Sequence, residues 1–212
     1  RILDFSAGWG DRLVAAIAHF AESYVAYDPN LALKRGHDNI IADLVSETDR
    51  PYSQNRFEVC YEPFETAYLG NDTFDLVFTS PPYYDLEIYT QLAGQSIINY
   101  PSFNEWLVMF LFASLRKAWS VLEAKGTMVI HISDYHKTHY VESMVLFVLG
   151  WCDGSVFEGV IGSVGTSQKA RPMWVFYKQS SGKGSSSQKK YRELMKTHYG
   201  EAYRLLTKSA AA

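Results

Sequence analysis

A chain of 212 residues has the size of a single globular domain. Apolar residues make up 47% of it and charged residues only 20%, which indicates a well-packed core and excludes a disordered chain. No apolar run is long enough to span a bilayer and no secretory leader is visible, so we expect an intracellular protein, cytoplasmic or nuclear. Cys60 and Cys152 lie in apolar stretches and are expected to be free thiols.

The formal net charge of −3 hides an asymmetry along the chain. From Lys178 onward, eight Lys or Arg residues stand against two Glu residues, so this segment is at +6 and the preceding part at −9. A basic segment on an acidic body can contact a phosphate backbone. The alternative is a solvated helix face with no such role.

The opening residues predict a strand, a glycine turn and a helix. Residues 1–5 form an apolar strand with no preceding segment, so we expect the natural chain to contain residues before Arg1. Gly8 and Gly10 follow, and glycines let a backbone approach a ligand closely. A helix over residues 13–20 would complete the start of a nucleotide-binding βαβ unit. Leu13 replaces the third glycine of the dinucleotide fingerprint, so no pyrophosphate site is expected, and Gly-x-Gly alone also suits a structural turn.

Two further strands end in side chains that suit a nucleoside. Residues 24–27 predict the second strand, which ends at Asp28, about twenty residues after the glycines. A carboxylate at that spacing can bind ribose hydroxyls, although Asp is also a common helix N-cap. Residues 57–61 predict the third strand, which ends at Glu62 and Phe64. These two side chains could hold the edge and face of an adenine, or serve as a helix cap and a core ring.

The fourth strand, predicted over residues 74–79, stops at Ser80-Pro81-Pro82-Tyr83. The prolines stiffen a loop at the carboxyl end of the strand, where open α/β sheets bind ligands. Ser80 Oγ and the Pro81 carbonyl could accept hydrogen bonds from an exocyclic amino group of adenine or cytosine, while Tyr83 could stack on a flipped base. Catalysis would then rest on placement and preset dipoles. The alternative is a plain Pro-Pro turn with loop aromatics.

The rest of the chain predicts alternating elements and then a tail. Residues 85–100 are expected to form a lid or substrate-binding loop, followed by a helix over 103–122, a fifth strand over 127–132 and a helix over 141–149. Residues 155–161 and 171–177 predict an antiparallel strand pair. We therefore expect a domain over residues 1–178, a flexible Ser/Gly-rich linker over 179–187 and a basic helix over 188–212. That helix carries a possible docking stripe of Tyr191, Leu194, Met195, Tyr203 and Leu206.

A group of His and Asp side chains also invites a metal interpretation. His131, Asp134, His136 and His139 lie close together in sequence, but they follow no tight ligand pattern. A packed histidine and loop histidines explain them better, so no metal site is expected.

Five strands alternating with helices, followed by an antiparallel pair, resemble the class I S-adenosylmethionine-dependent methyltransferases. Their fold is α/β and Rossmann-like, with a mostly parallel sheet. Within that class, the chain resembles the amino-methyltransferases of nucleic-acid bases, whose acid and Gly-x-Gly motif falls on Asp4, Gly8 and Gly10. Their ribose acid falls on Asp28 and their catalytic tetrapeptide on Ser80-Pro81-Pro82-Tyr83. The resemblance implies S-adenosylmethionine as the cofactor, bound by Asp4, Ser6, Gly8, Gly10, Asp28, Glu62 and Phe64.

The implied activity is methyl transfer to cytosine N4 or adenine N6 in DNA or RNA. Ser80 resembles the cytosine enzymes more than the adenine enzymes, and no separate target-recognition domain is evident. Two alternatives remain: a protein-glutamine methyltransferase, whose members carry Asn at position 80, and a catalytically silent subunit that scaffolds a partner. Nucleic acid is the expected partner, with a protein partner through the C-terminal helix as a further option and no membrane association.

Overall fold

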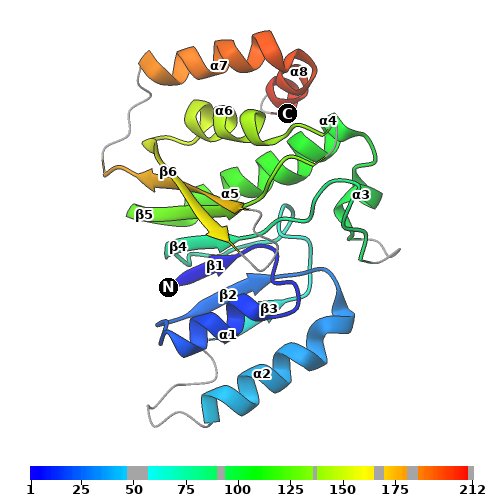
Figure 1. The fold of residues 1–212 in the computed structure, drawn as a ribbon, viewed down its shortest axis with the longest axis vertical. Helices are drawn as coiled ribbons and strands as arrows, with labels where there is room; N and C mark the ends of the chain where they lie inside the picture. Colours follow the sequence, from blue (N-terminus) through cyan, green and yellow to red (C-terminus); the bar gives the residue numbers. More distant parts are fainter. Residues whose placement is uncertain (47–56, 90–93, 136–137, 165–169, 181–185, 210–212) are drawn as a thin grey trace.

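The computed structural model describes residues 1–46, 57–89, 94–135, 138–164, 170–180 and 186–209. Its centre is one seven-stranded sheet in the order β3-β2-β1-β4-β5-β7-β6 (Figure 1). The strands are β1 (Ile2–Asp4), β2 (Tyr24–Tyr27), β3 (Phe57–Cys60), β4 (Phe74–Thr79), β5 (Leu122–His131), β6 (Ser155–Val164) and β7 (Ala170–Lys178). β1 to β5 pair in parallel, whereas β7 is antiparallel to both β5 and β6. The predicted Rossmann-like fold class is thereby confirmed.

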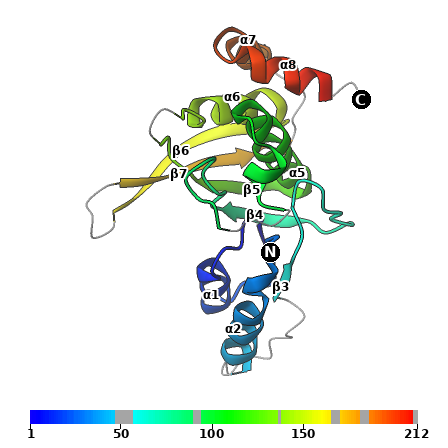
Figure 2. The same ribbon diagram turned by 90° about the vertical axis from the view of Figure 1, so that its right-hand side faces the viewer.

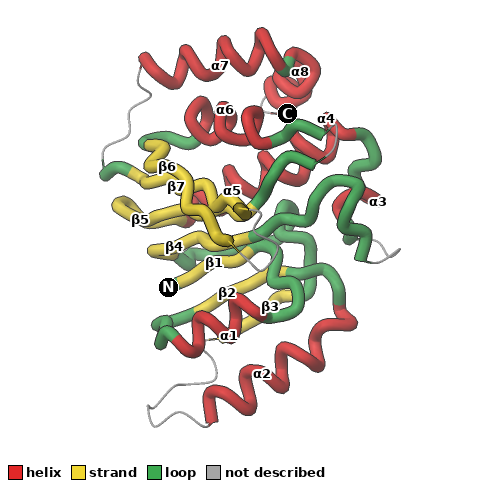
Figure 3. Tube along the Cα trace, in the orientation of Figure 1, coloured by secondary structure: helices red, strands yellow, loops and turns green. Residues whose placement is uncertain are grey.

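The described helices cover this sheet (Figure 3). They are α1 (Asp11–Ala18), the 3-10 turn η1 (Leu31–Leu33), α2 (Lys34–Ser46), α3 (Ser96–Asn99), α4 (Phe103–Glu105), the π-helical η3 (Trp106–Phe112), α5 (Ala113–Val121), α6 (Val141–Trp151), α7 (Ser186–His198) and α8 (Gly200–Ser209). Leu13, Ala16 and Ile17 of α1 pack with β2 and the start of β3 in a smaller apolar cluster. The larger cluster joins β1, β4, β5 and β7 with the helices from η3 to α8. Within the described residues, no helix combines the length and apolar character needed to cross a bilayer.

The strand order places a crevice beside the first strand. The chain runs outward from β1 to β2 and β3, then returns to place β4 on the other side of β1. Loops that leave β1 and β4 therefore diverge at the carboxyl edge of the sheet. In open α/β sheets this reversal point is where ligands bind.

Residues 103–121 are helical, close to the range predicted over 103–122. The helix is not uniform, because its central turns from Trp106 to Phe112 have π geometry. Every residue of η3 except Met109 is buried. A π segment shifts the register of the helix faces and is frequent near functional sites. Here it brings Phe110 to the cavity described below.

The C-terminal segment forms two helices, α7 and α8, where the sequence predicted one. The break at Tyr199 lets α7 pack along α6 while α8 turns to contact α4 and η3 (Figures 1 and 2). The predicted apolar stripe packs against the rest of the chain, and Met195 and Leu206 are buried in the larger core. Most of the expected linker, residues 181–185, lies outside the described residues.

Smaller differences concern element ends. The helix expected to run to Phe20 ends at Ala18, and Phe20 itself is exposed with a positive φ of 58°. The fifth strand begins at Leu122 instead of residue 127, with a shift in its register against β4 near Phe74. Residues 46–54, whose polar composition predicts a loop, fall almost wholly outside the described residues.

Candidate active site

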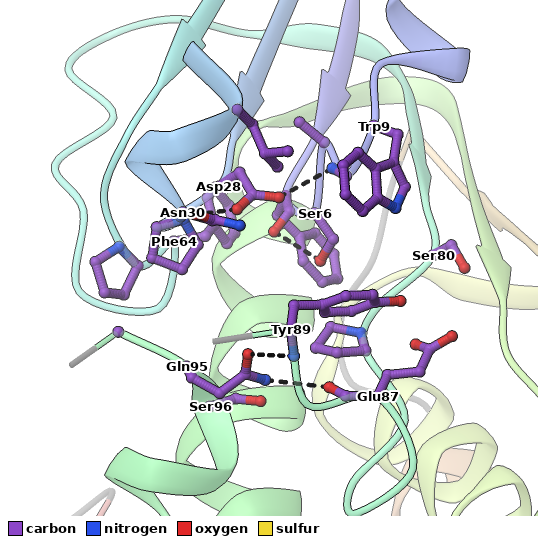
Figure 4. Close-up of a pocket in the computed structure, with 18 of the residues that line it drawn as sticks. Ser6, Trp9, Asp28, Asn30, Phe64, Ser80, Glu87, Tyr89, Gln95 and Ser96 are labelled. Atoms are coloured by element: carbon purple, nitrogen blue, oxygen red, sulfur yellow. Dashed lines mark hydrogen bonds between the residues drawn. The ribbon is translucent and has the colours of Figure 1, made fainter. Parts of the chain in front are cut away.

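One cavity of about 190 Å³ lies at the carboxyl edge of β1, β2, β3 and β4 (Figure 4). It is lined by the loops that follow these strands, by the segment around Glu87 to Ser96, and by Phe110 of η3. Of the eleven site residues predicted from the sequence, it brings together Ser6, Gly8, Asp28, Phe64, Ser80 and Pro82. The five others, Asp4, Gly10, Glu62, Pro81 and Tyr83, do not line it.

Asp4 is fully buried beneath the β1 loop. It accepts hydrogen bonds from the Ser6 backbone N–H (3.0 Å), the Tyr24 hydroxyl (2.8 Å) and Arg12 Nε (2.6 Å). Burial, with the charge of Asp4 as a further cause, raises the pKa of Tyr24, so that its phenol stays protonated. Arg12 also donates to the Ser6 carbonyl. Asp4 therefore shapes the loop from below, because its buried carboxylate is bonded to the loop backbone and to two side chains.

Asp28 and Gly8 meet across the first two strand ends. The Gly8 N–H donates to Asp28 Oδ2 at 2.9 Å, and the Asn30 N–H donates to Oδ1 at 2.9 Å. Burial raises the pKa of the Asp28 carboxyl, and the two backbone donors oppose that effect only in part. The carboxylate is thus fixed in orientation at the cavity wall, and each oxygen retains a lone pair for a ligand hydroxyl.

His37 of α2 binds the Gly8 carbonyl on the other side of the loop, a role that no motif in the sequence indicated. Its Nε2 lies 2.9 Å from the Gly8 carbonyl, and its Nδ1 lies 2.9 Å from the Tyr61 hydroxyl. Because a carbonyl can only accept, Nε2 carries the hydrogen and donates it to the Gly8 carbonyl. The side chain is 1% exposed. A buried histidine one helix away from a glycine loop gives no pattern that a single sequence reveals.

Gly10 makes room for a helix and does not border the ligand cavity. Its φ is +97°, and a Cβ there would come within 2.8 Å of Ile40 Cδ1 and 3.2 Å of His37 Cδ2. The close approach predicted for this glycine is therefore made by α2. Gly8, with φ +59° and a cavity-lining backbone, is the glycine at the site.

The loop after β3 contributes a buried ring and a different acid from the one predicted. Phe64 is 2% exposed and packs on Phe5, with ring centroids 5.2 Å apart. Lys117 Nζ fastens the loop by donating to the carbonyl of Phe64 at 2.8 Å. Glu62 is exposed away from the cavity, whereas Glu65 lines it, and burial raises the pKa of Glu65. The chain turns after Pro63, and this turn brings Glu65 instead of Glu62 to the cavity.

The loop after β4 presents Ser80 to the cavity. Ser80 Oγ donates its hydrogen to the His131 carbonyl at 3.0 Å, which leaves the oxygen lone pairs available as acceptors. Pro82 lines the cavity next to it, while Pro81 is buried. The half-buried ring of Tyr83 packs edge-on against Tyr140, with centroids 6.1 Å apart. The ring predicted to stack on a base is thus turned toward the core.

Two exposed aromatic rings line the cavity instead. Trp9, between the two glycines, is 73% exposed, and Tyr89, in the predicted lid, is 55% exposed. Burial, and to a smaller extent the negative charge of Glu87, raises the pKa of Tyr89 to about 12, so its phenol is neutral. Trp9 stands out in the sequence as a bulky residue inside a Gly-x-Gly turn, which is the signal that could have drawn attention to it.

In the His and Asp group near residue 134, Asp134 has a structural role. Asp134 Oδ1 accepts from the backbone N–H groups of Tyr140 (2.8 Å) and Val141 (2.9 Å) at the start of α6. Among the residues that the structure describes, no three His, Cys, Asp or Glu side chains are grouped as metal ligands would be. His136 lies outside the described part of the chain.

No protein-family model matches the chain, and no curated protein matches it in sequence. Solved structures do match its fold. An rRNA methylase from Streptococcus thermophilus is 15% identical, with a TM-score of 0.53 over 85% of this chain and 86% of the other. SMU.1697c from Streptococcus mutans, solved in complex with SAH, is 12% identical, with a TM-score of 0.56 over 84% and 87%.

TrmN from Thermus thermophilus is 12% identical and has a TM-score of 0.57 over 84% of this chain, but the match spans only 43% of TrmN. At such low identity these likenesses establish the fold. Together with the strand order, they place the chain among proteins with the Rossmann-like methyltransferase fold.

Proposed function

We propose that this protein transfers a methyl group from S-adenosylmethionine to the exocyclic amino nitrogen of a nucleic-acid base, cytosine N4 or adenine N6. The observation that carries the proposal is a single cavity bordered by Gly8 and Asp28 on one side and Ser80 on the other. A cofactor and an acceptor group can therefore meet within one site. The similar fold of a protein named as an rRNA methylase supports a nucleic-acid acceptor.

The residues around Asp28 fit a nucleoside cofactor. A carboxylate held by two backbone N–H groups keeps acceptor capacity for ribose hydroxyls, and Phe64 with Pro63 offers an apolar wall for a flat ring. When bound, S-adenosylmethionine supplies a methyl group on a cationic sulfonium. The charged side chains that line the cavity suit a cation, because Asp11, Asp28, Glu65 and Glu87 outnumber Arg12.

Ser80 is the residue we assign to the acceptor amine. Its O–H is engaged by the His131 carbonyl, so Oγ faces an incoming N–H group as an acceptor and not as a donor. An amino nitrogen held in this way has its lone pair drawn out of conjugation with the ring and turned toward the methyl donor. Ser80 needs no general base beside it, because its task is to orient the amine and stabilise the positive charge that develops there. As the nitrogen bonds to the methyl group, the C–S bond breaks to give S-adenosylhomocysteine, and the nitrogen then releases one proton to solvent.

Exposed basic side chains are also available to the expected nucleic-acid partner. Lys189, Lys190, Lys196, Arg204 and Lys208 are exposed on α7 and α8. We propose that these side chains contact phosphates, which would make binding fall as salt rises. The apolar stripe on the same helices already packs against the larger core, so it provides no support for a protein partner.

The decisive experiment offers the protein a methyl-labelled cofactor with separate pools of single-stranded DNA, RNA and protein. Mass spectrometry of the digested nucleosides should find N4-methylcytosine or N6-methyladenine. Ser80→Ala should lower kcat at least tenfold while the affinity for S-adenosylhomocysteine stays within about twofold, because one polar contact to the reacting group is lost. Ser120→Ala, an exposed serine on α5, is the matched control.

Two results would reject the proposal. One is undiminished turnover by the Ser80→Ala variant. The other is label that enters only the protein pool, which would favour glutamine methylation instead.

A further inference from the structure

Trp9 is held at the cavity by a rigid loop and yet is largely exposed to solvent. The Gly8 N–H and carbonyl are fixed by Asp28 and His37, and a side chain at position 10 would collide with α2. The backbone on both sides of Trp9 is therefore constrained, which fixes the point from which its ring projects. The Trp9 side chain is 73% exposed, and it belongs to neither of the two apolar clusters formed by the described residues.

Tyr89 lies on the opposite wall, where the Gln95 side chain holds the backbone of this segment through two hydrogen bonds, an arrangement that we call the Gln95 brace. The Tyr89 backbone N–H donates to Gln95 Oε1 at 3.2 Å, and Gln95 Nε2 donates to the Glu87 carbonyl at 3.3 Å (Figure 4). The Glu87 carboxylate accepts from the Tyr83 N–H at 3.1 Å, which ties this segment to the Ser80 loop. Gln95 is only 6% exposed, so the brace is protected from water.

The two rings lie at the acceptor end of the cavity. In Figure 4, Asp28, Asn30 and Phe64 lie at one end, whereas Trp9 lies at the other, toward Ser80, with the Tyr89 ring below. The ring of Tyr83, in contrast, packs against Tyr140. The aromatic surface beside the reacting position is thus supplied by Trp9 and Tyr89.

We propose that Trp9 and Tyr89 form a clamp that stacks on the target base and holds its amino group at Ser80. This inference rests on the proposed function and names the residues that recognise its substrate. A base drawn out of its strand loses stacking with its neighbours, and aromatic side chains can replace it. Because every base has a π face, the clamp holds the base without selecting which base it is.

The test uses the full chain and an oligonucleotide that contains the base methylated by the wild type. Trp9→Ala and Tyr89→Ala should each raise KM for this oligonucleotide about tenfold, as expected for loss of one stacking partner. The affinity for S-adenosylhomocysteine should stay within about twofold, because the clamp lies at the acceptor end. Tyr68→Ala is the matched control, since Tyr68 is 88% exposed and does not line the cavity.

Fluorescence supplies a readout independent of turnover. With S-adenosylhomocysteine bound, the oligonucleotide should quench tryptophan emission, and a matched oligonucleotide with an abasic site at the target should not. The Trp9→Phe variant, which keeps a ring and the fold, should lose the quench and retain most of the affinity.

The outcomes separate the two proposals. Failure of the wild type to methylate any nucleic acid would overturn the proposed function and the clamp with it. Methylation by the wild type, with an unchanged oligonucleotide KM in both alanine variants, would overturn the clamp alone. The clamp would also be overturned if the alanine variants bound S-adenosylhomocysteine more weakly and kept an unchanged KM for the oligonucleotide. That result would mean that the two rings contact the cofactor.

Discussion

At the scale of single residues, the candidate site is built from polar groups whose bonding capacity is partly used by the protein itself. Asp4 is buried and accepts from Ser6, Arg12 and Tyr24, whereas Asp28, among the described residues, is held by two backbone N–H groups and faces the cavity. Two acids at neighbouring strand ends therefore differ in role. One maintains the loop and the other remains available to a ligand.

Asp28→Asn should lower the affinity for S-adenosylhomocysteine at least tenfold, because a charged acceptor is lost and an amide NH2 group meets a backbone N–H. The ligand hydroxyls need the ionised carboxylate, so wild-type affinity should fall as the pH drops through the Asp28 pKa. Burial raises this pKa, so the fall should begin at a higher pH than for an exposed aspartate. Isothermal titration calorimetry across acidic pH checks this, and a wild-type profile parallel to that of the variant would contradict it.

At the scale of elements, the packing of α2 against the β1 loop decides where the glycines are needed. Gly10 lies under Ile40 and His37, and its φ of +97° is one that other residues rarely adopt. Gly36 lies in α2 itself, where a Cβ would meet nothing within 4 Å. A side chain would therefore be accommodated at Gly36 but would collide with α2 at Gly10.

Gly10→Ala should destabilise the protein by about 1–3 kcal/mol through backbone strain and contact with α2. It should also weaken cofactor binding, because His37 holds Gly8. Gly36→Ala should stabilise the protein by about 0.5–1 kcal/mol, since alanine is the better helix former. Urea unfolding of both variants measures these free energies, and a change of the same sign in both would contradict the packing described.

At the scale of the whole molecule, the C-terminal helices form part of the folded body. α7 packs on α6, and residues of α7 and α8 join the same core as β4 and β5. The basic residues of the segment therefore project from a fixed surface and not from a loose tail.

Met195→Ala should lower the free energy of unfolding by about 2–5 kcal/mol, because Met195 is fully buried and its loss leaves a cavity. Lys196→Ala, at the exposed neighbouring position, should change it by less than about 0.5 kcal/mol. Thermal or urea unfolding of the full chain makes the comparison. An unchanged stability in the Met195 variant would mean that α7 folds separately from the domain.

The elements of this chain could be predicted because their signals are local. Strands ending at Asp28 and at Ser80 follow from apolar runs closed by turn residues, and parallel pairing then brings these ends to one edge of the sheet. Six of the eleven predicted site residues meet at one cavity for that reason.

The direction of each side chain was decided by contacts between residues far apart in sequence. Tyr83 and Tyr89 are both loop tyrosines, yet Tyr140 draws the first toward the core while the Gln95 brace leaves the second at the cavity. Trp9 and Tyr89, eighty positions apart, share a cavity only because β4 folds back beside β1. Periodicity and turn chemistry fix which segments form strands and helices, but the burial of one ring in preference to another depends on the partner that tertiary packing provides.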